Sequence, residues 1–501
     1  MIDALFNLVQ PVPFVTLLIG LVAGIIVGAL PGMTGGTLMA LTLAFTYYMA
    51  STNAVILLIA MYVGGVSGGL ITATLMRIPG EPASIMTTLD GYPLARQGRP
   101  GRAIGLGVGA SLVGGVLSWL ALVFLSPPLA QFGLRFGPFE TFALVLMALI
   151  FIASLSQGSF LKGLMSGLFG MLVSMPGIDE TSGVLRLTFG FPAMEGGLHI
   201  LPVILGIFAL SQVLADALHV EQRFESVEAS TSGIFLSLRD YVTHGWNMLR
   251  SAIIGIWIGI LPGVGPAISS IIAYTTAKNV SKTPERFGTG CEEGIVASEA
   301  ANNACTGGTL IPVITLGIPG GLTDAVLLSA LIIHNLQPGP LLFVNNPHIV
   351  YAIMATHLAS HVLMFVLMTL GCVLFARIMF LPRGYLLPLI LISCIVGAFA
   401  VNNRMFDVWV MLAFGLVGYG MEYARVPLAP FAIGLILAPL AEGQLRSGLM
   451  ASAGSLVPLV ERPIALSFVL ASVAMCAWPF YRDYRRRQRG PTYPAGPSDR
   501  D

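Results

Sequence analysis

Long stretches of the chain carry only apolar and small side chains, and charged residues are confined to the segments between them. Residues 103–134 and 349–376 contain no Asp, Glu, Lys or Arg. Each stretch is longer than the roughly 20 residues with which a helix crosses a bilayer. The runs are too long for the strands of a membrane barrel, so the backbone is expected to cross as helices, which satisfy their own N–H and C=O groups.

The apolar segments predict an all-α polytopic membrane protein. Several segments are too short to cross alone and predict half-helices that meet at Gly/Pro breaks, which gives about 11 crossings. The predicted segments are residues 13–30, 37–50, 54–76, 103–126, 138–156, 160–174, 200–215, 248–261, 266–278, 307–316, 325–337, 349–376, 385–401, 407–421, 430–440 and 464–480.

Two kinds of break recur in the two halves of the chain. Residues 24–32 read GIIVGALPG and residues 255–263 read GIWIGILPG. Residues 68–80 share their first Gly, a Leu-Ile pair and a closing Ile-Pro-Gly with residues 308–320. Paired Gly/Pro interruptions at matching positions of two halves indicate the binding site of a transporter.

The charges around the breaks predict that the two halves have opposite orientations. Basic residues mark the cytoplasmic side of a membrane protein. They occur in residues 96–102, after the first Ile-Pro-Gly, and in residues 278–286, after the second Leu-Pro-Gly, whereas residues 50–53 and 341–347 carry no charge. Equivalent loops then lie on opposite sides, as in an inverted-topology repeat. The alternative is that this charge distribution arose by chance.

These patterns divide the chain into five parts. The Arg-rich tail is placed in the cytoplasm, and the first ten residues, which lack Lys and Arg, in the periplasm. The parts are a first transmembrane repeat (1–215), a cytoplasmic linker (216–247), a second transmembrane repeat (248–463), an extra helix (464–481) and the tail (482–501).

Composition excludes several other classes. Only 10% of the 501 residues are charged and 55% are hydrophobic, whereas about 25% of a soluble protein is charged. The net charge of +1 and the absence of a Gly-Lys dipeptide give no indication of nucleic-acid binding or of an ATP-binding loop. His357 and His361 share a helix face, but a metal site needs further ligands and none is placed near them, which favours packing or interhelical hydrogen bonds. From these observations together we expect no enzyme, no catalytic residue, no bound metal and no cofactor.

The breaks themselves suggest an anion site. Opened backbone at membrane depth is tolerated inside protein or beside water, and helix starts present free N–H groups and a positive dipole end. The alternative for any single Gly or Pro is kinking or close helix packing. The candidate substrate-binding residues are Gly32, Thr34, Gly35, Ser67, Gly68, Pro79, Gly80, Gly263, Gly265, Asn302, Asn303, Thr306, Gly307, Pro319 and Gly320.

Two acidic residues near the breaks are candidates for a coupling ion. Glu299 and Asp324 are taken as the acidic groups nearest the breaks, and an ionisable residue buried inside the membrane suggests a cation or proton role. The alternative is that both carboxylates cap helix starts at the water boundary.

Several motifs resemble the large permease subunit of tripartite tricarboxylate transporters, the TctA family. The resemblance covers most of residues 15–440, and its most specific part is the run from Glu299 to Gly320. The matching motifs are Gly28-Ala-Leu-Pro-Gly32, Ile78-Pro-Gly-Glu-Pro-Ala-Ser84, Leu89-Asp-Gly-Tyr-Pro93, Arg186-Leu-Thr-Phe-Gly190, Gly206-Ile-Phe-Ala-Leu-Ser211, Glu299-Ala-Ala-Asn-Asn-Ala304, Gly307-Gly-Thr-Leu-Ile-Pro312 and Leu316-Gly-Ile-Pro-Gly320.

The resemblance implies an uptake permease of the bacterial inner membrane. Such a permease imports citrate or other organic carboxylates by symport with Na⁺ or H⁺, together with a small four-helix membrane subunit (TctB-like) and a periplasmic solute-binding protein (TctC-like). An ion or solute channel, or a stand-alone transporter of another small anion, is the alternative reading.

The chain departs from the family pattern at three positions. It has Arg77 where family members commonly have Asn, Ser67 where they commonly have Tyr, and Ser298 where they usually have Pro. Arg77 either binds a carboxylate with its guanidinium or marks the cytoplasmic end of a helix. These departures concern the substrate more than the transport mechanism.

Overall fold

The computed structural model describes the chain except for residues 31–32, 156–158, 180–181, 218–226, 379–382 and 489–501. The described part is helical apart from one antiparallel hairpin of β1 (Gly177–Ile178) and β2 (Leu185–Arg186). Six of its helices are long and apolar enough to cross a membrane, and shorter apolar helices accompany them. The predicted all-α polytopic class is therefore confirmed.

The helices before residue 218 follow the predicted apolar segments closely. They are α1 (Ile2–Leu8), α2 (Pro11–Gly28), α3 (Gly35–Thr46), α4 (Ser51–Met76), η1 (Pro82–Ser84), α5 (Thr87–Arg96), α6 (Pro100–Gly133), α7 (Pro138–Leu155), α8 (Phe160–Val173), η2 (Pro192–Met194), α9 (Ile200–Ile204), η3 (Leu205–Leu210) and α10 (Ser211–Ala217).

The helices after residue 226 include two long helices that end at the second Leu-Pro-Gly and the second Ile-Pro-Gly, and they continue to the C-terminal tail. They are α11 (Leu238–Ile260), α12 (Gly265–Val280), η4 (Pro284–Arg286), α13 (Glu292–Leu316), α14 (Leu322–Ile333), α15 (Pro340–Asn345), α16 (Pro347–Ile378), α17 (Arg383–Asn402), α18 (Met405–Tyr423), α19 (Leu428–Ala451), α20 (Pro458–Glu461) and α21 (Pro463–Gln488).

Local sequence accounts for many helix boundaries. Proline opens α2, α6 and α16, where its missing N–H costs no hydrogen bond. Gly317 ends α13 in the left-handed conformation that glycine adopts most easily. Ser237 and Asp240 form a reciprocal capping box at the start of α11.

Two helices begin earlier than the apolar runs predict. The run at 307–316 is only the last part of α13, which starts at Glu292, and α11 starts at Leu238, inside the predicted linker 216–247. The first half of α13 carries Ser, Glu and Asn side chains, yet all of it from Gly294 onward is buried. A polar helix buried inside protein lacks the apolar signal of a helix that faces lipid.

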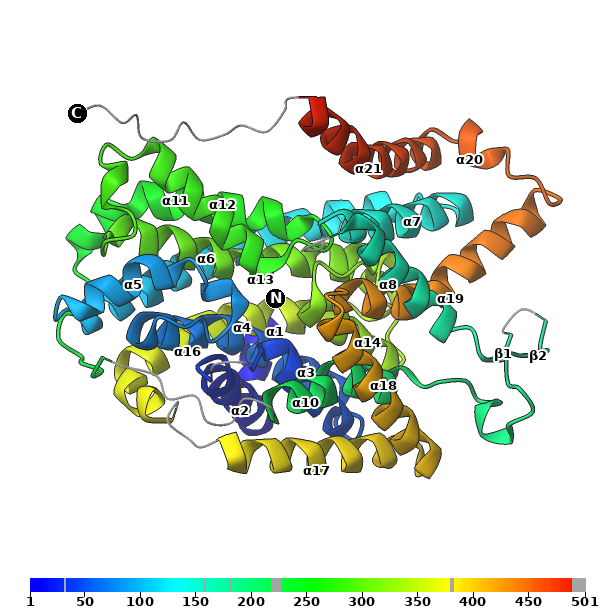
Figure 1. The fold of residues 1–501 in the computed structure, drawn as a ribbon, viewed down its shortest axis with the longest axis horizontal. Coiled ribbons are helices and arrows are strands. Elements are labelled where there is room, and N and C mark those ends of the chain that lie inside the picture. Colours follow the sequence, from blue (N-terminus) through cyan, green and yellow to red (C-terminus); the bar gives the residue numbers. More distant parts are fainter. Residues whose placement is uncertain (31–32, 156–158, 180–181, 218–226, 379–382, 489–501) are drawn as a thin grey trace, which may run out of the picture.

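The central helices of the fold are α4 and α13. α4 packs against α2 and α16, and α13 packs against α6, α11 and α12. The apolar stretch of α4 that is long enough to cross a membrane is entirely buried. Figure 1 shows α21 along one long edge of the molecule and α17 along the opposite edge, with these central helices between them.

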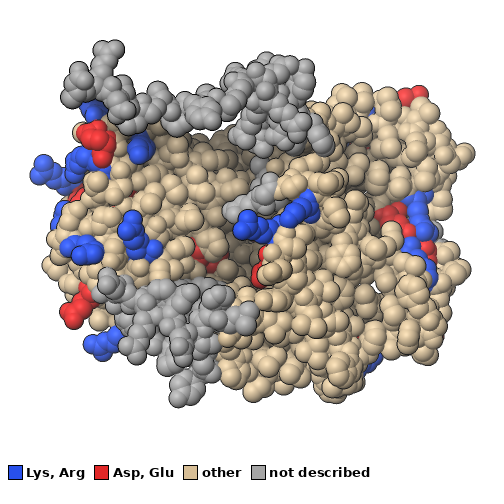
Figure 2. Space-filling model, in the orientation of Figure 1, with Lys and Arg blue, Asp and Glu red and all other residues tan. Residues whose placement is uncertain are grey.

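Most of the surface is apolar, and the charged side chains are concentrated at the ends. Figure 2 shows Lys and Arg gathered at the end of the molecule where α5, α11 and α12 lie in Figure 1, and a second charged group at the opposite end. A few charged side chains also lie near the middle of this face, beside its hollow (Figure 2), and the tan surface around them is of the kind expected beside lipid acyl chains.

Candidate functional site

The two Leu-Pro-Gly segments pack in the same way in the two halves. A methyl group on Gly28 in α2 would overlap the Gly65 carbonyl oxygen of α4, and one on Gly259 in α11 would lie 2.7 Å from the Cys305 carbonyl oxygen of α13. The same match holds one turn earlier, where the pairs are Gly24 with Met61 and Gly255 with Ala301. The sequence repeat is therefore also a repeat of helix contacts.

The helices before the two Ile-Pro-Gly segments end alike. α4 ends at Arg77 with φ 59° and ψ 24°, and α13 ends at Gly317 with φ 71° and ψ 26°. Both residues are left-handed, a conformation that glycine and asparagine adopt with less strain than arginine. Arg77 is exposed, and the structure assigns it the role of ending α4.

The segments after the breaks meet each other. A methyl group on Gly36, in the first turn of α3, would lie 3.1 Å from the Thr323 hydroxyl of α14. A methyl group on Gly321 would lie 3.9 Å from the Cα of Gly265, where α12 begins. Helix starts from both halves thus lie against residues 321–324.

The starts of α3 and α12 differ in one respect. The Gly35 N–H of α3 donates a 2.8 Å hydrogen bond to the Glu81 carboxylate, and the Thr34 hydroxyl accepts from the Thr37 N–H. The start of α12 has Val264 at its cap position and no side-chain cap. Glu81 directly follows Ile78-Pro79-Gly80, and the residue at the same place after Ile318-Pro319-Gly320 is Gly321. The second half therefore lacks the carboxylate that occupies the helix start in the first half.

A buried hydrogen-bond network joins α4, α6 and α13. The Ser67 hydroxyl donates to the Asn303 side-chain oxygen at 2.7 Å. The Asn303 amide donates to the Ser111 hydroxyl and to the Asn302 side-chain oxygen, both at 2.8 Å. All four side chains are fully buried. Three of the predicted site residues, Ser67, Asn302 and Asn303, are thus brought together.

Glu299 belongs to the same network. Its carboxylate accepts hydrogen bonds from Thr87, from Asn302 at 3.2 Å and from Ser111 at 3.5 Å. The side chain is fully buried and lies seven residues inside α13. The alternative that Glu299 caps a helix start at the water boundary is therefore wrong.

Asp324 is buried without a comparable set of partners. It lies in the first turn of α14 with no exposed surface, and among the described residues neither carboxylate oxygen makes a hydrogen bond of good geometry. The hydroxyls of Tyr62 and Thr309 lie beside it and hydrogen bond to each other at 3.1 Å. Asp324 does lie at a helix start, as the alternative proposed, but it is fully buried and not exposed to water.

Several predicted site residues face neighbouring helices instead of the breaks. A methyl group on Gly307 would lie 2.5 Å from the Ser118 hydroxyl of α6, and one on Gly68 would overlap the Ile25 carbonyl of α2. The Thr306 hydroxyl lies 3.1 Å from His357 Nε2 in α16. The predicted hydrogen bonding of His357 is therefore confirmed.

The remaining predicted positions lie at the breaks themselves. Gly263 and Gly265 are left-handed, with φ 79° and φ 67°, and Gly263 lies against Ile152 of α7. A methyl group on Gly80 would overlap the Gly28 carbonyl, and one on Gly320 would lie 3.2 Å from the Gly259 carbonyl. Pro79 and Pro319 precede these two glycines, and Gly32 lies outside the described residues.

Sequence reasoning missed Glu81, Tyr62, Thr87 and Ser111. Glu81 had a visible signal, because it is an acidic residue directly after a Pro-Gly break, nearer to that break than Glu299 is to its own. The other three are single polar groups in helices distant in sequence from residues 299–324. Only the fold brings them to the site.

An ion-pair cluster joins three polar segments at the basic end of the molecule. Arg102 of α6 contacts Asp240 at 2.7 Å and Glu292 at 2.8 Å, and Arg99 contacts Glu292 at 2.9 Å. The Arg102 guanidinium and the Ser237 hydroxyl hold the pKa of the Asp240 carboxyl well below its usual range. The predicted linker is therefore tied to both halves at this end.

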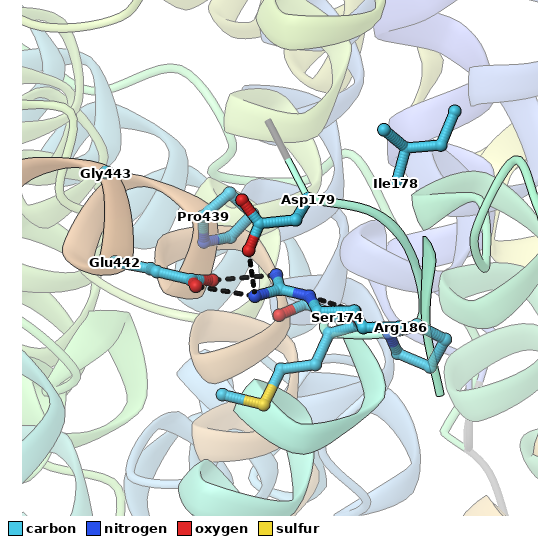
Figure 3. A pocket seen from close by; sticks show the side chains of 9 residues that line it. Ser174, Ile178, Asp179, Arg186, Pro439, Glu442 and Gly443 are labelled. Carbon is cyan, nitrogen blue, oxygen red and sulfur yellow. Dashed lines mark hydrogen bonds and ion pairs between the residues drawn. The ribbon is translucent and has the colours of Figure 1, made fainter. Parts of the chain in front are cut away.

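A second cluster lies at the opposite end, beside the β1–β2 hairpin. Figure 3 shows Arg186 directed at Glu442 of α19 and at Asp179. Its two terminal nitrogens contact the Glu442 carboxylate at 2.6 and 2.8 Å, and one of them contacts Asp179 at 3.1 Å. Paired contacts of this kind fix geometry. The Arg186 motif therefore has a structural role, in fixing the hairpin to α19.

The comparisons with known proteins agree with these features. A profile of the tripartite tricarboxylate transporter TctA family matches residues 14–433. A protein of Agrobacterium vitis, described as an uncharacterized 52.8 kDa protein in the TAR-I ttuC' 3'region, is 32% identical over 495 residues, which are 97% of this chain and 98% of that protein.

A second Agrobacterium vitis protein, described as an uncharacterized protein in the TAR-II ttuC' 3'region, is 33% identical over 234 residues, which are 46% of this chain and 97% of that protein. No solved structure matches the chain. The family profile spans both pairs of breaks and the network around Glu299. The chain is a multi-pass membrane protein and belongs to the TctA family of tripartite tricarboxylate transporters.

Proposed function

We propose that the chain is the ion-gradient-driven uptake permease for an organic carboxylate, working in the bacterial inner membrane with a small four-helix membrane subunit and a periplasmic solute-binding protein. The family supports the transport of tricarboxylates and the presence of partner subunits. The energy source, the two partners and the binding site are parts of the proposal.

One observation carries the proposed substrate site. In the first half, the Glu81 carboxylate binds the N–H at the start of α3. In the second half the matching position is Gly321, which places no side chain at the start of α12. Helix starts bind anions through free N–H groups and the positive dipole end. A substrate carboxylate at Gly265 would therefore take the position that Glu81 holds in the other half.

The contacts also support the inverted arrangement. The charged loop after the first Ile-Pro-Gly touches the charged loop after the second Leu-Pro-Gly, since Gln97 donates to the Thr289 carbonyl at 2.8 Å and Arg99 pairs with Glu292. An inverted repeat places these two non-equivalent loops on one side. We assign that side to the cytoplasm, with the C-terminal tail.

A charge placed at Gly321 tests the substrate site. Gly321 has φ −170° and ψ −169°, an extended backbone that any residue adopts. We expect Gly321→Glu to supply an internal carboxylate to the start of α12 and to reduce citrate uptake at least tenfold, through electrostatic competition with the substrate. Gly321→Gln has nearly the same size without the charge, so it should retain several times more uptake than Gly321→Glu.

The measurement is uptake of labelled citrate into vesicles that contain the permease with both partner subunits, under an imposed Na⁺ or proton gradient. Equal uptake by the Glu and Gln variants would remove the site from the start of α12. Uptake by the unaltered protein that persists after the gradient has collapsed would contradict ion coupling, and an ohmic current would identify a channel.

A further inference from the structure

We infer that Asp324 is the residue that binds the coupling cation, and that Glu299 is a structural carboxylate. This inference rests on the proposed function and assigns its cation site. The two residues were equivalent candidates in the sequence, but their surroundings in the fold differ.

The Glu299 carboxylate is surrounded by hydrogen-bond donors from the protein itself. Hydroxyls of Thr87 and Ser111 and the amide of Asn302 surround its carboxylate and tie α13 to α5 and α6. A buried carboxylate with donors of this kind requires no further ligand. A cation bound there would have to displace or turn these donors away.

Asp324 has the opposite surroundings. It is fully buried, and neither oxygen makes a hydrogen bond of good geometry among the described residues, although the Tyr62 and Thr309 hydroxyls lie within reach. Among the described residues, the titratable groups that face it are Tyr62 of α4 and Cys305 of α13, and neither is basic; Glu81 in turn lies near Tyr62. A buried charge without a partner is costly, so the carboxylate requires a proton or a metal cation to be stable there.

The atoms beside Asp324 suit a small monovalent cation. The Tyr62 and Thr309 hydroxyl oxygens lie next to the carboxylate. The Thr309 hydroxyl donates its hydrogen to the Thr306 carbonyl at 3.0 Å and then accepts from the Tyr62 hydroxyl, which leaves one lone pair on Thr309 and those of Tyr62 available. Oxygen atoms of carboxylates, hydroxyls and opened backbone are the ligands that coupling ions use in broken-helix transporters.

The position of Asp324 links the cation to the substrate. Gly321, three residues earlier, lies against Gly265 at the start of α12, and Thr323 lies against Gly36 at the start of α3. An unneutralised Asp324 would repel a substrate carboxylate at those helix starts. A cation there removes the repulsion, so each ligand strengthens the binding of the other by the same factor.

The test uses the full-length protein in lipid nanodiscs and measures the midpoint of thermal unfolding. The probes are NaCl against choline chloride at constant ionic strength, and pH from 8.5 to 5.5. We expect one of the two cations to raise the midpoint by about 2 °C or more in the unaltered protein. A rise with NaCl identifies Na⁺, and a rise only with falling pH identifies the proton.

Three variants assign the response. Asp324→Asn should abolish it, whereas Glu299→Gln should retain it even if its starting midpoint is lower. Ser329→Ala is the matched control in α14, because the Ser329 hydroxyl bonds only to the Ala325 carbonyl of its own helix. An unchanged response in Asp324→Asn, a loss only in Glu299→Gln, or no response to either cation in the unaltered protein would overturn the inference.

Citrate uptake by the same variants separates the two proposals. If gradients drive uptake equally well in Asp324→Asn and in the unaltered protein, the cation site is wrong and the permease function stands. If the unaltered protein responds to a cation through Asp324 but moves no citrate, the proposed substrate is wrong and the cation site stands.

Discussion

At the scale of single residues, the structure gives each of the two departures near the first break a distinct setting, one in the backbone and one in a side-chain hydrogen bond. Arg77 occupies a left-handed position whose counterpart in the second half is Gly317. Asparagine, which the family commonly has there, adopts this conformation more readily than a long side chain does. Ser67, the other departure, hydrogen bonds to Asn303 and so belongs to the buried network.

Arg77→Asn should therefore stabilise the protein. Left-handed backbone costs an ordinary residue about 1–2 kcal/mol, of which asparagine recovers a part, so we expect a gain of about 0.5–1 kcal/mol in unfolding free energy. Unfolding in detergent measures it. The control is Arg96→Asn, an exposed position in the last turn of α5. An equal gain in both variants would assign the effect to charge instead of backbone.

The sequence could identify the acidic candidates but not rank them. Glu299 and Asp324 both stood out as carboxylates near the breaks. Their difference depends on Thr87 and Ser111, about 200 residues before Glu299, which supply donors to one carboxylate and not to the other. Pairing at this sequence separation is a property of the fold, and no local pattern encodes it.

At the scale of helices, glycine sets how closely each pair approaches. α2 and α4 meet at Gly28 and Gly65, and α11 and α13 meet at Gly259 and Cys305. Lipid provides no hydrophobic force between helices, so such close backbone contact is a main source of their association. Close helix packing was the alternative role for any single glycine. For several of these glycines it is the role that the contacts indicate.

Alanine substitutions test this packing. Gly28→Ala should lower the unfolding free energy by about 1–3 kcal/mol, because its methyl group overlaps a backbone oxygen that cannot move alone. Gly259→Ala, where the gap is 2.7 Å, should cost less. Gly420→Ala in α18 has no neighbour within 4 Å and should be neutral or stabilising. Thermal unfolding of the three variants in detergent ranks them, and equal effects would refute the contact explanation.

Helix positions were predictable where a helix is apolar, whether exposed or buried as in α4, and less so where a buried helix is polar. The apolar runs at 13–30 and 349–376 correspond to α2 and α16 within a few residues. The run at 307–316 represents less than half of α13, because the first part of that helix is polar and buried against α6 and α11. Capping by Ser237 and Asp240 marked the start of α11, but the charge of the surrounding segment suggested a linker.

At the scale of the whole molecule, the basic loops gather at one end. Residues 96–102, 237–240 and 286–293 come from both halves and contact one another. The sequence predicted, on charge alone, that residues 96–102, residues 278–286 and the linker 216–247 lie in the cytoplasm, and residues 287–293 directly follow the second of these segments. Contact among the three loops agrees with a position on the same side of the membrane. That this side is the cytoplasm stays a prediction.

Cysteine labelling in intact cells checks this placement. We expect Arg96→Cys and Lys282→Cys to be protected from a membrane-impermeant thiol reagent until the cells are opened. Tyr47→Cys, at the exposed end of α3 just before the uncharged residues 50–53, and Val344→Cys, exposed within the uncharged residues 341–347, should react from outside. The background is a chain with Cys476→Ser, since Cys476 is partly exposed whereas Cys291, Cys305, Cys372 and Cys394 are buried. Reaction of Arg96→Cys and Lys282→Cys from opposite faces would exclude the inverted arrangement.

The Arg102 cluster constrains how the permease changes shape. Its ion pairs bind α6, the start of α11 and the start of α13 into one unit. A motion that separates these helices at that end must break the pairs, and its rate would then depend on ionic strength. A motion that keeps these ion pairs must pivot about that end. The Arg102 cluster would then act as a hinge, and the helices would separate at the opposite end of the molecule.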